Sequence, residues 1–83
     1  MEEGRIEFAR SAWNKFLRFF PSPHDKQCLK DELLRRRAEP DAGTRVPFGQ
    51  WDGCYVTWAE KWRIIYQKGN PGGIYVVDID KIG

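Results

Sequence analysis

Arginine and aromatic side chains occur together in residues 53–67, which read Gly-Cys-Tyr-Val-Thr-Trp-Ala-Glu-Lys-Trp-Arg-Ile-Ile-Tyr-Gln. Arg63 and Trp58 are the members of this segment best suited to chemistry. A guanidinium can hold a phosphate or stabilise a developing negative charge, and an indole can stack on a base. The alternative is structural: Arg63 pairs with an acidic neighbour such as Glu60 or Asp78, and Trp58 lies in the core. The residue types alone leave both interpretations open.

The elements that would position these side chains are the two strands of a hairpin. Residues on either side of Glu60 and Lys61 are rich in β-branched and aromatic types, which predicts a two-residue turn at these positions. The turn contains no glycine or asparagine, so its type stays open. One face of the hairpin then carries Trp58 and Arg63 together with Gln67. The predicted cross-strand pairs are Tyr55 with Tyr66, Val56 with Ile65, Thr57 with Ile64, Trp58 with Arg63, and Ala59 with Trp62.

Two helices are predicted between the first strand and residue 38. In the first, apolar residues at spacings of three and four form one stripe, and Pro21 ends the helix. Ser22, Pro23 and Asp25 predict the start of the second helix by a reciprocal capping pattern, and residues 35–37, all arginine, fall in its last turn near the negative end of the helix dipole. The predicted buried stripes are Trp13, Phe16, Leu17 and Phe20, then Cys28, Leu29 and Leu33 with Leu34 at the margin; Lys15 and Arg18 are expected to point away from the first stripe.

Strands are predicted at both ends of the chain. Residues 5–9 alternate polar and apolar types, which is typical of a short strand. Residues 39–50 form an irregular connection, residues 69–73 a turn, and residues 74–79 a last strand. On this last strand, Ile74 and Val76 are expected on one face, and Tyr75, Val77 and Ile79 on the other. We therefore expect one α+β domain over residues 1–83: a short N-terminal strand, two helices packed on one face, and a three-stranded antiparallel meander.

Composition narrows the classes of function. A chain of 83 residues with 12 aromatic side chains (Trp 4, Tyr 3, Phe 5) forms one small domain with an aromatic core. The net charge is only +2, so the clustered basic residues are compatible with a polyanionic partner but are also explained by a solvated helix face. No signal peptide or membrane span is predicted, which leads us to expect a cytoplasmic protein with Cys28 and Cys54 reduced.

Other catalytic arrangements have weaker support. His24, Cys28 and Cys54 lack the paired spacing of zinc ligands, and a helix start followed by a packed thiol explains the first two better. Asp78 and Asp80 could act as an acid and base pair, although carboxylates facing water at a strand end are the ordinary explanation. We expect no metal and no small-molecule cofactor.

The order of elements and four short motifs resemble the RelE/ParE superfamily of small toxins from bacterial and archaeal toxin-antitoxin systems. The motifs are Arg-Ile-Glu-Phe at 5–8 before an amphipathic helix, Gly-x-Tyr at 53–55, Lys-Trp-Arg-Ile-Ile-Tyr at 61–66, and an aliphatic last strand ending Asp-Lys-Ile-Gly at 80–83. The similarity covers nearly the full chain. Resemblance to the RelE branch implies a metal-independent endoribonuclease that enters the ribosomal A site and cleaves mRNA, with the RNA 2′-hydroxyl as nucleophile.

The resemblance also implies a role for each candidate site residue. Arg63 would be catalytic and stabilise charge on the scissile phosphate, and RNA contacts would come from Lys61, Trp58, Gln67 and Arg45. The expected partners are the ribosome with its mRNA and a cognate antitoxin protein that covers the basic face. The alternatives are a ParE-like gyrase inhibitor, which acts by binding, and a non-catalytic binding protein of the same fold.

Overall fold

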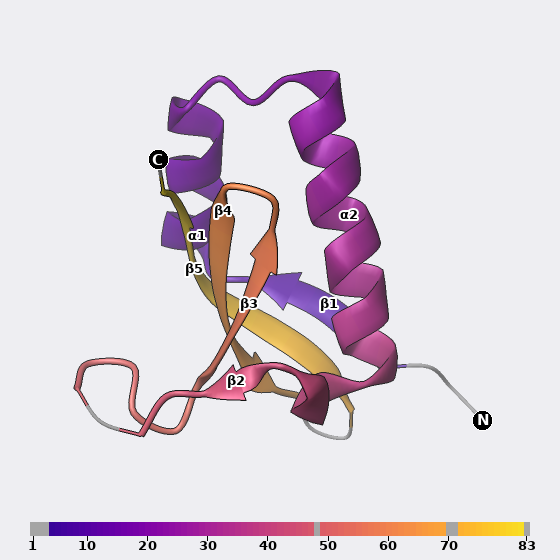
Figure 1. Ribbon diagram of the computed structural model, residues 1–83, viewed down its shortest axis with the longest axis vertical. Helices are drawn as coiled ribbons and strands as arrows, with labels where there is room; N and C mark the ends of the chain where they lie inside the picture. The colour runs from indigo at the N-terminus through magenta and orange to yellow at the C-terminus, as the bar shows by residue number, and fades with distance from the viewer. Residues whose placement is uncertain (1–3, 48, 70–71, 83) are drawn as a thin grey trace.

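The computed structural model of the chain describes residues 4–47, 49–69 and 72–82. Within these ranges the chain is an α+β domain with two α-helices and one mixed sheet of five strands. The elements are β1 (Arg5–Phe8), α1 (Arg10–Arg18), α2 (Pro23–Ala38), the 3-10 turn η1 (Pro40–Ala42), β2 (Thr44–Arg45), β3 (Tyr55–Ala59), β4 (Trp62–Lys68) and β5 (Gly73–Lys81) (Figure 1).

The sheet is larger than the three-stranded arrangement predicted from the sequence. Its strand order is β1-β5-β4-β3-β2, with β1 parallel to β5 and the other neighbours antiparallel. The two-residue strand β2 lies inside the segment 39–50, which was predicted to be irregular throughout. At the other edge, the residue before β1 lies very close to the start of β5: a Cβ on Gly4 would lie 2.0 Å from the backbone nitrogen of Gly73. A residue without a side chain is therefore required at position 4.

The hairpin of β3 and β4 has the predicted register, with Trp58 opposite Arg63. Its turn includes Glu60 with a backbone φ of 57°, in the left-handed region that non-glycine residues adopt uncommonly. A positive φ matches the twist of two-residue hairpin loops, so Glu60 takes the place that glycine or asparagine usually fills. The second predicted turn, at 69–73, includes residues 70 and 71, which lie outside the described residues.

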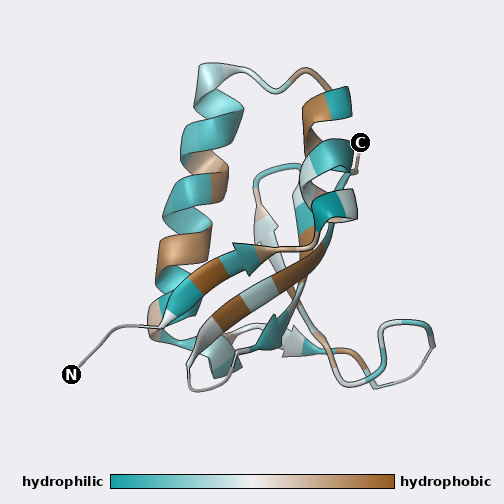
Figure 2. Cartoon of the chain, turned by 180° about the vertical axis from the view of Figure 1, so that it is seen from behind, coloured by the Kyte–Doolittle hydropathy of each residue, from teal (hydrophilic) through white to brown (hydrophobic). Residues whose placement is uncertain are grey.

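Both helices pack on one face of the sheet, where they form the hydrophobic core (Figure 1). Seen from behind, β5 carries broad apolar bands, β1 alternates polar and apolar bands, and much of α2 is polar (Figure 2). Among the described residues, no helix is long and apolar enough to cross a membrane. The core cluster contains Ala12 and Phe16 from α1, Leu29 and Leu33 from α2, and Ala59, Trp62, Ile64, Tyr66, Ile74, Val76 and Ile79 from the strands.

The buried stripe of α1 is narrower than predicted. Phe16 is fully buried, whereas Phe20 is 91% exposed. The helix ends before Phe20, whose φ of 52° turns the chain away from the core. Phe19, which lies off the predicted stripe, makes a T-shaped contact with Trp62, with ring centroids 5.6 Å apart. The other predicted members, Trp13 and Leu17, are also exposed.

The start of α2 is the predicted capping box. The Ser22 hydroxyl accepts a hydrogen bond from the Asp25 backbone N–H at 3.1 Å, and the Asp25 carboxylate accepts one from the Ser22 backbone N–H at 3.0 Å. The second bond is the main reason that the pKa of Asp25 lies below its ordinary value of 3.8. Leu29 and Leu33 are buried as predicted, while Leu34 is exposed.

Glu32 is a buried charge that the sequence pattern did not predict. Its carboxylate accepts a hydrogen bond from the Thr57 hydroxyl of β3 and lies 3.1 Å from Arg36 Nε. Arg35 Nη2 approaches the same carboxylate at 3.5 Å. Two members of the arginine run therefore neutralise a carboxylate that links α2 to the sheet.

Candidate functional site

A β-bulge in β5 reverses the alternation of side chains near the end of that strand. The pairing of β4 with β5 shifts between Ile65 and Tyr66, and Val77 is the extra residue on the bulged strand. As a result, Ile79 lies in the same core cluster as Val76 and is fully buried. Its predicted position on the other face is wrong, because strict alternation does not allow for an inserted residue.

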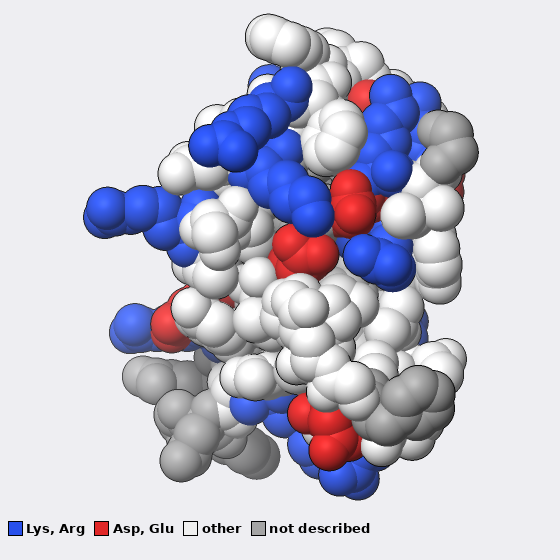
Figure 3. Space-filling view, turned by 90° about the vertical axis from the view of Figure 1, so that its left-hand side faces the viewer, with Lys and Arg blue, Asp and Glu red and all other residues white. Residues whose placement is uncertain are grey.

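The bulge places Asp78 and Asp80 beside Arg63 on the sheet face away from the helices. Asp80 is the cross-strand partner of Arg63, and its Oδ2 lies 3.5 Å from Arg63 Nη2; Asp78 Oδ2 lies 3.9 Å from the same nitrogen. Lys15 of α1 reaches both carboxylates at 3.4 Å. These four residues are termed the charge cluster. Figure 3 shows lysine and arginine side chains gathered around acidic atoms on this side of the molecule.

The charge cluster is formally neutral and partly open to solvent. The side chains of Arg63 and Lys15 are 34% and 38% exposed, and those of Asp78 and Asp80 are 14% and 27% exposed. Solvent screens ion pairs at this level of exposure, so each is a weak contact. Arg63 Nε is buried and has no hydrogen-bond partner among the described residues. The two carboxylates therefore do not satisfy the whole guanidinium.

The structural interpretation, with Trp58 in the core and Arg63 paired with an acidic residue, is wrong for Trp58 and confirmed for Arg63. Trp58 is 50% exposed, so it is not a core residue. Arg63 does pair with acidic neighbours, including Asp78, as the structural interpretation expected. Its acidic partners are Asp78 and Asp80, while the Glu60 carboxylate contacts His24 at 3.1 Å. Arg63 is thus a paired arginine that keeps a third of its side chain in solvent next to an exposed indole.

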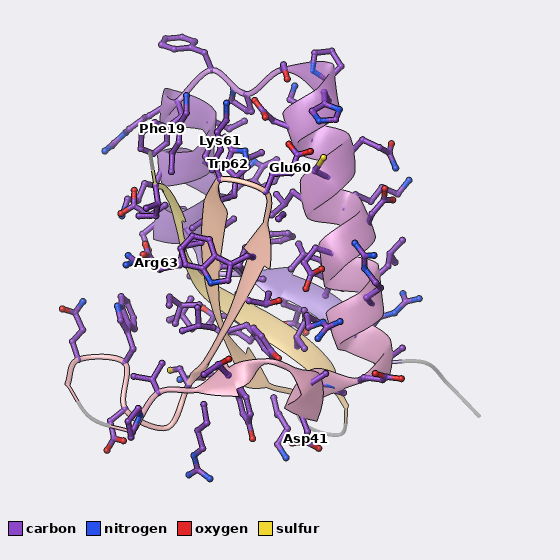
Figure 4. The ribbon with its side chains drawn as sticks, in the orientation of Figure 1. Phe19, Asp41, Glu60, Lys61, Trp62 and Arg63 are labelled. Carbon is purple, nitrogen blue, oxygen red and sulfur yellow. The ribbon has the colours of Figure 1, made fainter. Side chains whose placement is uncertain are left out.

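The five predicted site residues divide between the two ends of the hairpin. Lys61 lies at its tip and Arg63 two residues along β4, whereas Asp41, which contacts Tyr55 and Lys68, lies at the opposite end (Figure 4). Gln67 is four residues beyond Arg63, roughly 13 Å along an extended strand. There, Arg45 and Gln67 line a polar pocket of about 420 Å³ together with Asp52, Gly53, Tyr55 and Lys68.

Three members of the charge cluster were not predicted as site residues. Lys15 was expected to point away from the core, as it does, but its reach to β5 depends on how α1 packs against that strand. For Asp78 and Asp80, the sequence favours ordinary carboxylates at a strand end over an acid and base pair. Their spacing, two residues apart in a strand, was the available signal, and the bulge that brings them to Arg63 has no clear mark in the sequence.

The charge cluster contains the residue types that cleave RNA without a metal. Such a reaction needs a base for the 2′-hydroxyl, an acid for the departing oxygen and a cation for the charged phosphorus centre. A carboxylate, an ammonium group and a guanidinium can take these roles. Donor atoms spaced for a metal ion occur elsewhere among the described residues, in His24, Cys28 and Glu60 at the α2 side of the hairpin tip.

In comparisons with protein-family models, with curated proteins and with solved structures, nothing matches this chain. A functional assignment accordingly rests on the chain's own residues and geometry.

Proposed function

We propose that this protein is a RelE-type toxin that acts in the cytoplasm, where it cleaves mRNA in the ribosomal A site. The observation that carries the proposal is the position of Arg63, on the sheet face away from the helices and directly across from the exposed indole of Trp58. A guanidinium next to a stacking surface suits a phosphate and its neighbouring base. The order of a strand, two helices and a sheet of mainly antiparallel strands also supports the resemblance.

The charge cluster supplies the proposed reaction. Asp80, the more exposed of the two carboxylates, accepts the proton of the RNA 2′-hydroxyl, whose oxygen attacks the adjacent phosphorus. Arg63 stabilises the negative charge that develops on the phosphate oxygens. Protonated Lys15 donates a proton to the departing 5′-oxygen. The products are a 2′,3′-cyclic phosphate and a 5′-hydroxyl, so no metal and no other reactant is consumed.

The remaining candidates bind RNA away from the scissile bond. Trp58 stacks on a base beside the reacting phosphate, and Lys61 at the hairpin tip contacts the backbone. Gln67 lies too far along β4 to reach the same phosphate, and Arg45 lies on β2 beside that far end of the hairpin, so both contact nucleotides farther along the RNA. The polar pocket that they line provides the surface for this contact.

The proposed partner that restrains the toxin is a cognate antitoxin with a helical segment. A groove of about 210 Å³ between β1, α1 and α2 is lined mainly by apolar side chains, including Trp13 and Leu29. Leu17, one helical turn from Trp13 on α1, is also exposed and lies on the same side of the helix. A protein encoded by a neighbouring short reading frame should bind the wild-type chain, and Trp13→Glu should weaken that complex. Equal binding by both chains would contradict this docking site.

The neutrality of the charge cluster favours a second candidate function. Two cations and two carboxylates cancel formally, which lowers the attraction for a polyanion such as RNA. A ParE-like inhibitor of DNA gyrase, or another binding protein of this fold, needs no exposed catalytic cation. In this case the charge cluster would only hold α1 against β5.

Toeprinting of mRNA in a purified translation system separates the two candidates. Wild type should produce cuts at A-site codons, and Arg63→Ala should reduce the cutting rate about 100-fold or more while keeping a wild-type circular dichroism spectrum. Asp80→Asn should reduce it by a similar factor, since loss of a general base typically costs 10²- to 10⁴-fold. Arg18→Ala, which removes an exposed arginine of α1, is the matched control and should cut like wild type.

Two outcomes would contradict the nuclease proposal. If a folded Arg63→Ala variant cuts as fast as wild type, Arg63 has no part in the reaction. If wild type leaves mRNA intact but traps cleavage complexes of DNA gyrase, the binding inhibitor is the correct assignment.

A further inference from the structure

Three side chains that commonly ligate metals converge at the tip of the hairpin. His24 and Cys28 lie one helical turn apart on α2, and Glu60 lies in the turn between β3 and β4. Figure 4 shows Glu60 on the side of the hairpin tip that faces α2, whereas Arg63 lies on the opposite side. His24 Nε2 is 3.1 Å from both carboxylate oxygens of Glu60 and 3.4 Å from Cys28 Sγ. The three donor groups all lie within 4.8 Å of one another.

We propose that His24, Cys28 and Glu60 form a zinc-binding site. In a tetrahedral site, zinc bonds of about 2.0–2.3 Å place neighbouring ligand atoms roughly 3.3–3.6 Å apart. The observed separations of 3.1 and 3.4 Å from His24 Nε2 are close to this range, so small side-chain rotations suffice to bind the ion. Thiolate, imidazole and carboxylate together suit zinc, whereas magnesium and calcium prefer oxygen ligands alone. Three protein ligands leave the fourth position to water.

The electrostatics of the site favour a divalent cation. The Glu60 carboxylate lies beside the Cys28 thiol, and Asp25 and Asp31 are near enough to act on that thiol electrostatically. Three carboxylates around one small site attract a cation. A bound zinc ion would stabilise the Cys28 thiolate directly, and the surrounding negative charge strengthens the attraction for the ion.

The site is open to solvent and joins segments that are distant in the sequence. The His24 and Glu60 side chains are 70% and 55% exposed, so an ion can enter without rearrangement of the fold. His24 and Glu60 are 36 residues apart, and a shared ion would hold the start of α2 against the hairpin tip. Because these ligands come together only in the folded chain, zinc should stabilise it. The site also explains why a glutamate occupies a turn position with positive φ.

Titration of the full reduced chain with Co²⁺, a spectroscopic substitute for zinc, tests the proposal. Wild type should bind one ion per chain, with a thiolate-to-cobalt absorption band in the near ultraviolet and the visible bands of a tetrahedral ion, and zinc should displace it. Cys28→Ser should remove the thiolate band, while His24→Gln and Glu60→Gln should weaken binding at least tenfold. Cys54→Ser is the matched control because it removes the other thiol, which lies outside the site. Gln27→Ala is a second control on α2, and both should retain the band.

Thermal unfolding gives an independent readout. Zinc should raise the melting temperature of wild type and Gln27→Ala, and should raise that of Glu60→Gln much less at the same zinc concentration. The proposal is overturned if wild type gives no thiolate band, if the band persists in Cys28→Ser, or if one ion is bound by two chains. None of these results depends on Arg63 or on cleavage of RNA. The zinc site and the nuclease activity are therefore tested independently, and either proposal can be refuted without the other.

Discussion

Arg63 and Asp80 face each other across β4 and β5, with Arg63 Nη2 3.5 Å from Asp80 Oδ2. The pair depends on the extra residue Val77. Without the bulge, alternation from Val76 would turn Asp80 toward the helices and Ile79 toward the open face. A bulge that re-aims side chains is a frequent feature near functional sites. In this chain it is the structural cause of the charge cluster.

A double-mutant cycle should show that the Arg63–Asp80 pair contributes little to stability. We expect a coupling of about 0.5–1 kcal/mol in the free energy of unfolding between Arg63→Ala and Asp80→Asn, because both side chains are partly solvated and the pair is screened. Urea unfolding of the four chains measures it, and added salt should reduce it. Arg18→Ala combined with Asp80→Asn should be additive. A coupling near 3 kcal/mol would instead indicate a buried structural ion pair and weaken the case for a functional arginine.

Loss of the Glu32 carboxylate should destabilise the fold far more than loss of an exposed one. Glu32→Ala leaves Arg36, whose side chain is 16% exposed, and the Thr57 hydroxyl without their partner. We expect a cost of about 3 kcal/mol in urea unfolding, typical of breaking a buried pair from one side. Asp31→Ala on the exposed side of α2 is the control and should change stability by less than about 0.5 kcal/mol. Similar losses in the two variants would show that Glu32 does not link α2 to the sheet.

The features that the sequence predicted are those encoded by neighbouring residues. The capping box needs only Ser22 and Asp25, three positions apart, and the hairpin register follows from the turn at residues 60 and 61. By contrast, the burial of Glu32 depends on Thr57, 25 residues away, and the side-chain directions in β5 depend on one inserted residue. Contacts of this kind leave no local pattern.

The candidate site shows the same division. Trp58 and Arg63 could be placed together because the hairpin register fixes their pairing. Gln67 shares their face in the prediction but lies at the far end of the strand, since residues on one face of a hairpin are not necessarily close together. Lys15 comes from a helix, and its contact with β5 is a result of tertiary packing that the pattern of α1 alone does not specify.

Replacing Glu60 by glycine should stabilise the metal-free chain. Relief of the left-handed backbone is worth roughly 1–2 kcal/mol, and the greater freedom of glycine in the unfolded chain costs about 0.5–1 kcal/mol. We therefore expect a net gain of between zero and about 1.5 kcal/mol in urea unfolding, together with loss of any stabilisation by zinc. Lys61→Gly, at the other turn position, has no positive φ to relieve and should destabilise the chain. A loss of stability in Glu60→Gly would mean that the contact with His24 outweighs the backbone strain.

The capping box should make stability depend on pH in the acid range through Asp25. The hydrogen bond from the Ser22 backbone lowers the pKa of Asp25 in the folded chain below its ordinary value of 3.8. A group with a depressed folded-state pKa stabilises fully above the unfolded-state value, and this contribution is lost as the pH falls through the folded-state value. The free energy of unfolding of wild type should therefore fall more steeply than that of Asp25→Asn between about pH 5 and pH 2. Asp52→Asn, in an exposed loop, should keep the wild-type slope, whereas equal slopes for wild type and Asp25→Asn would show that the cap does not contribute to acid sensitivity.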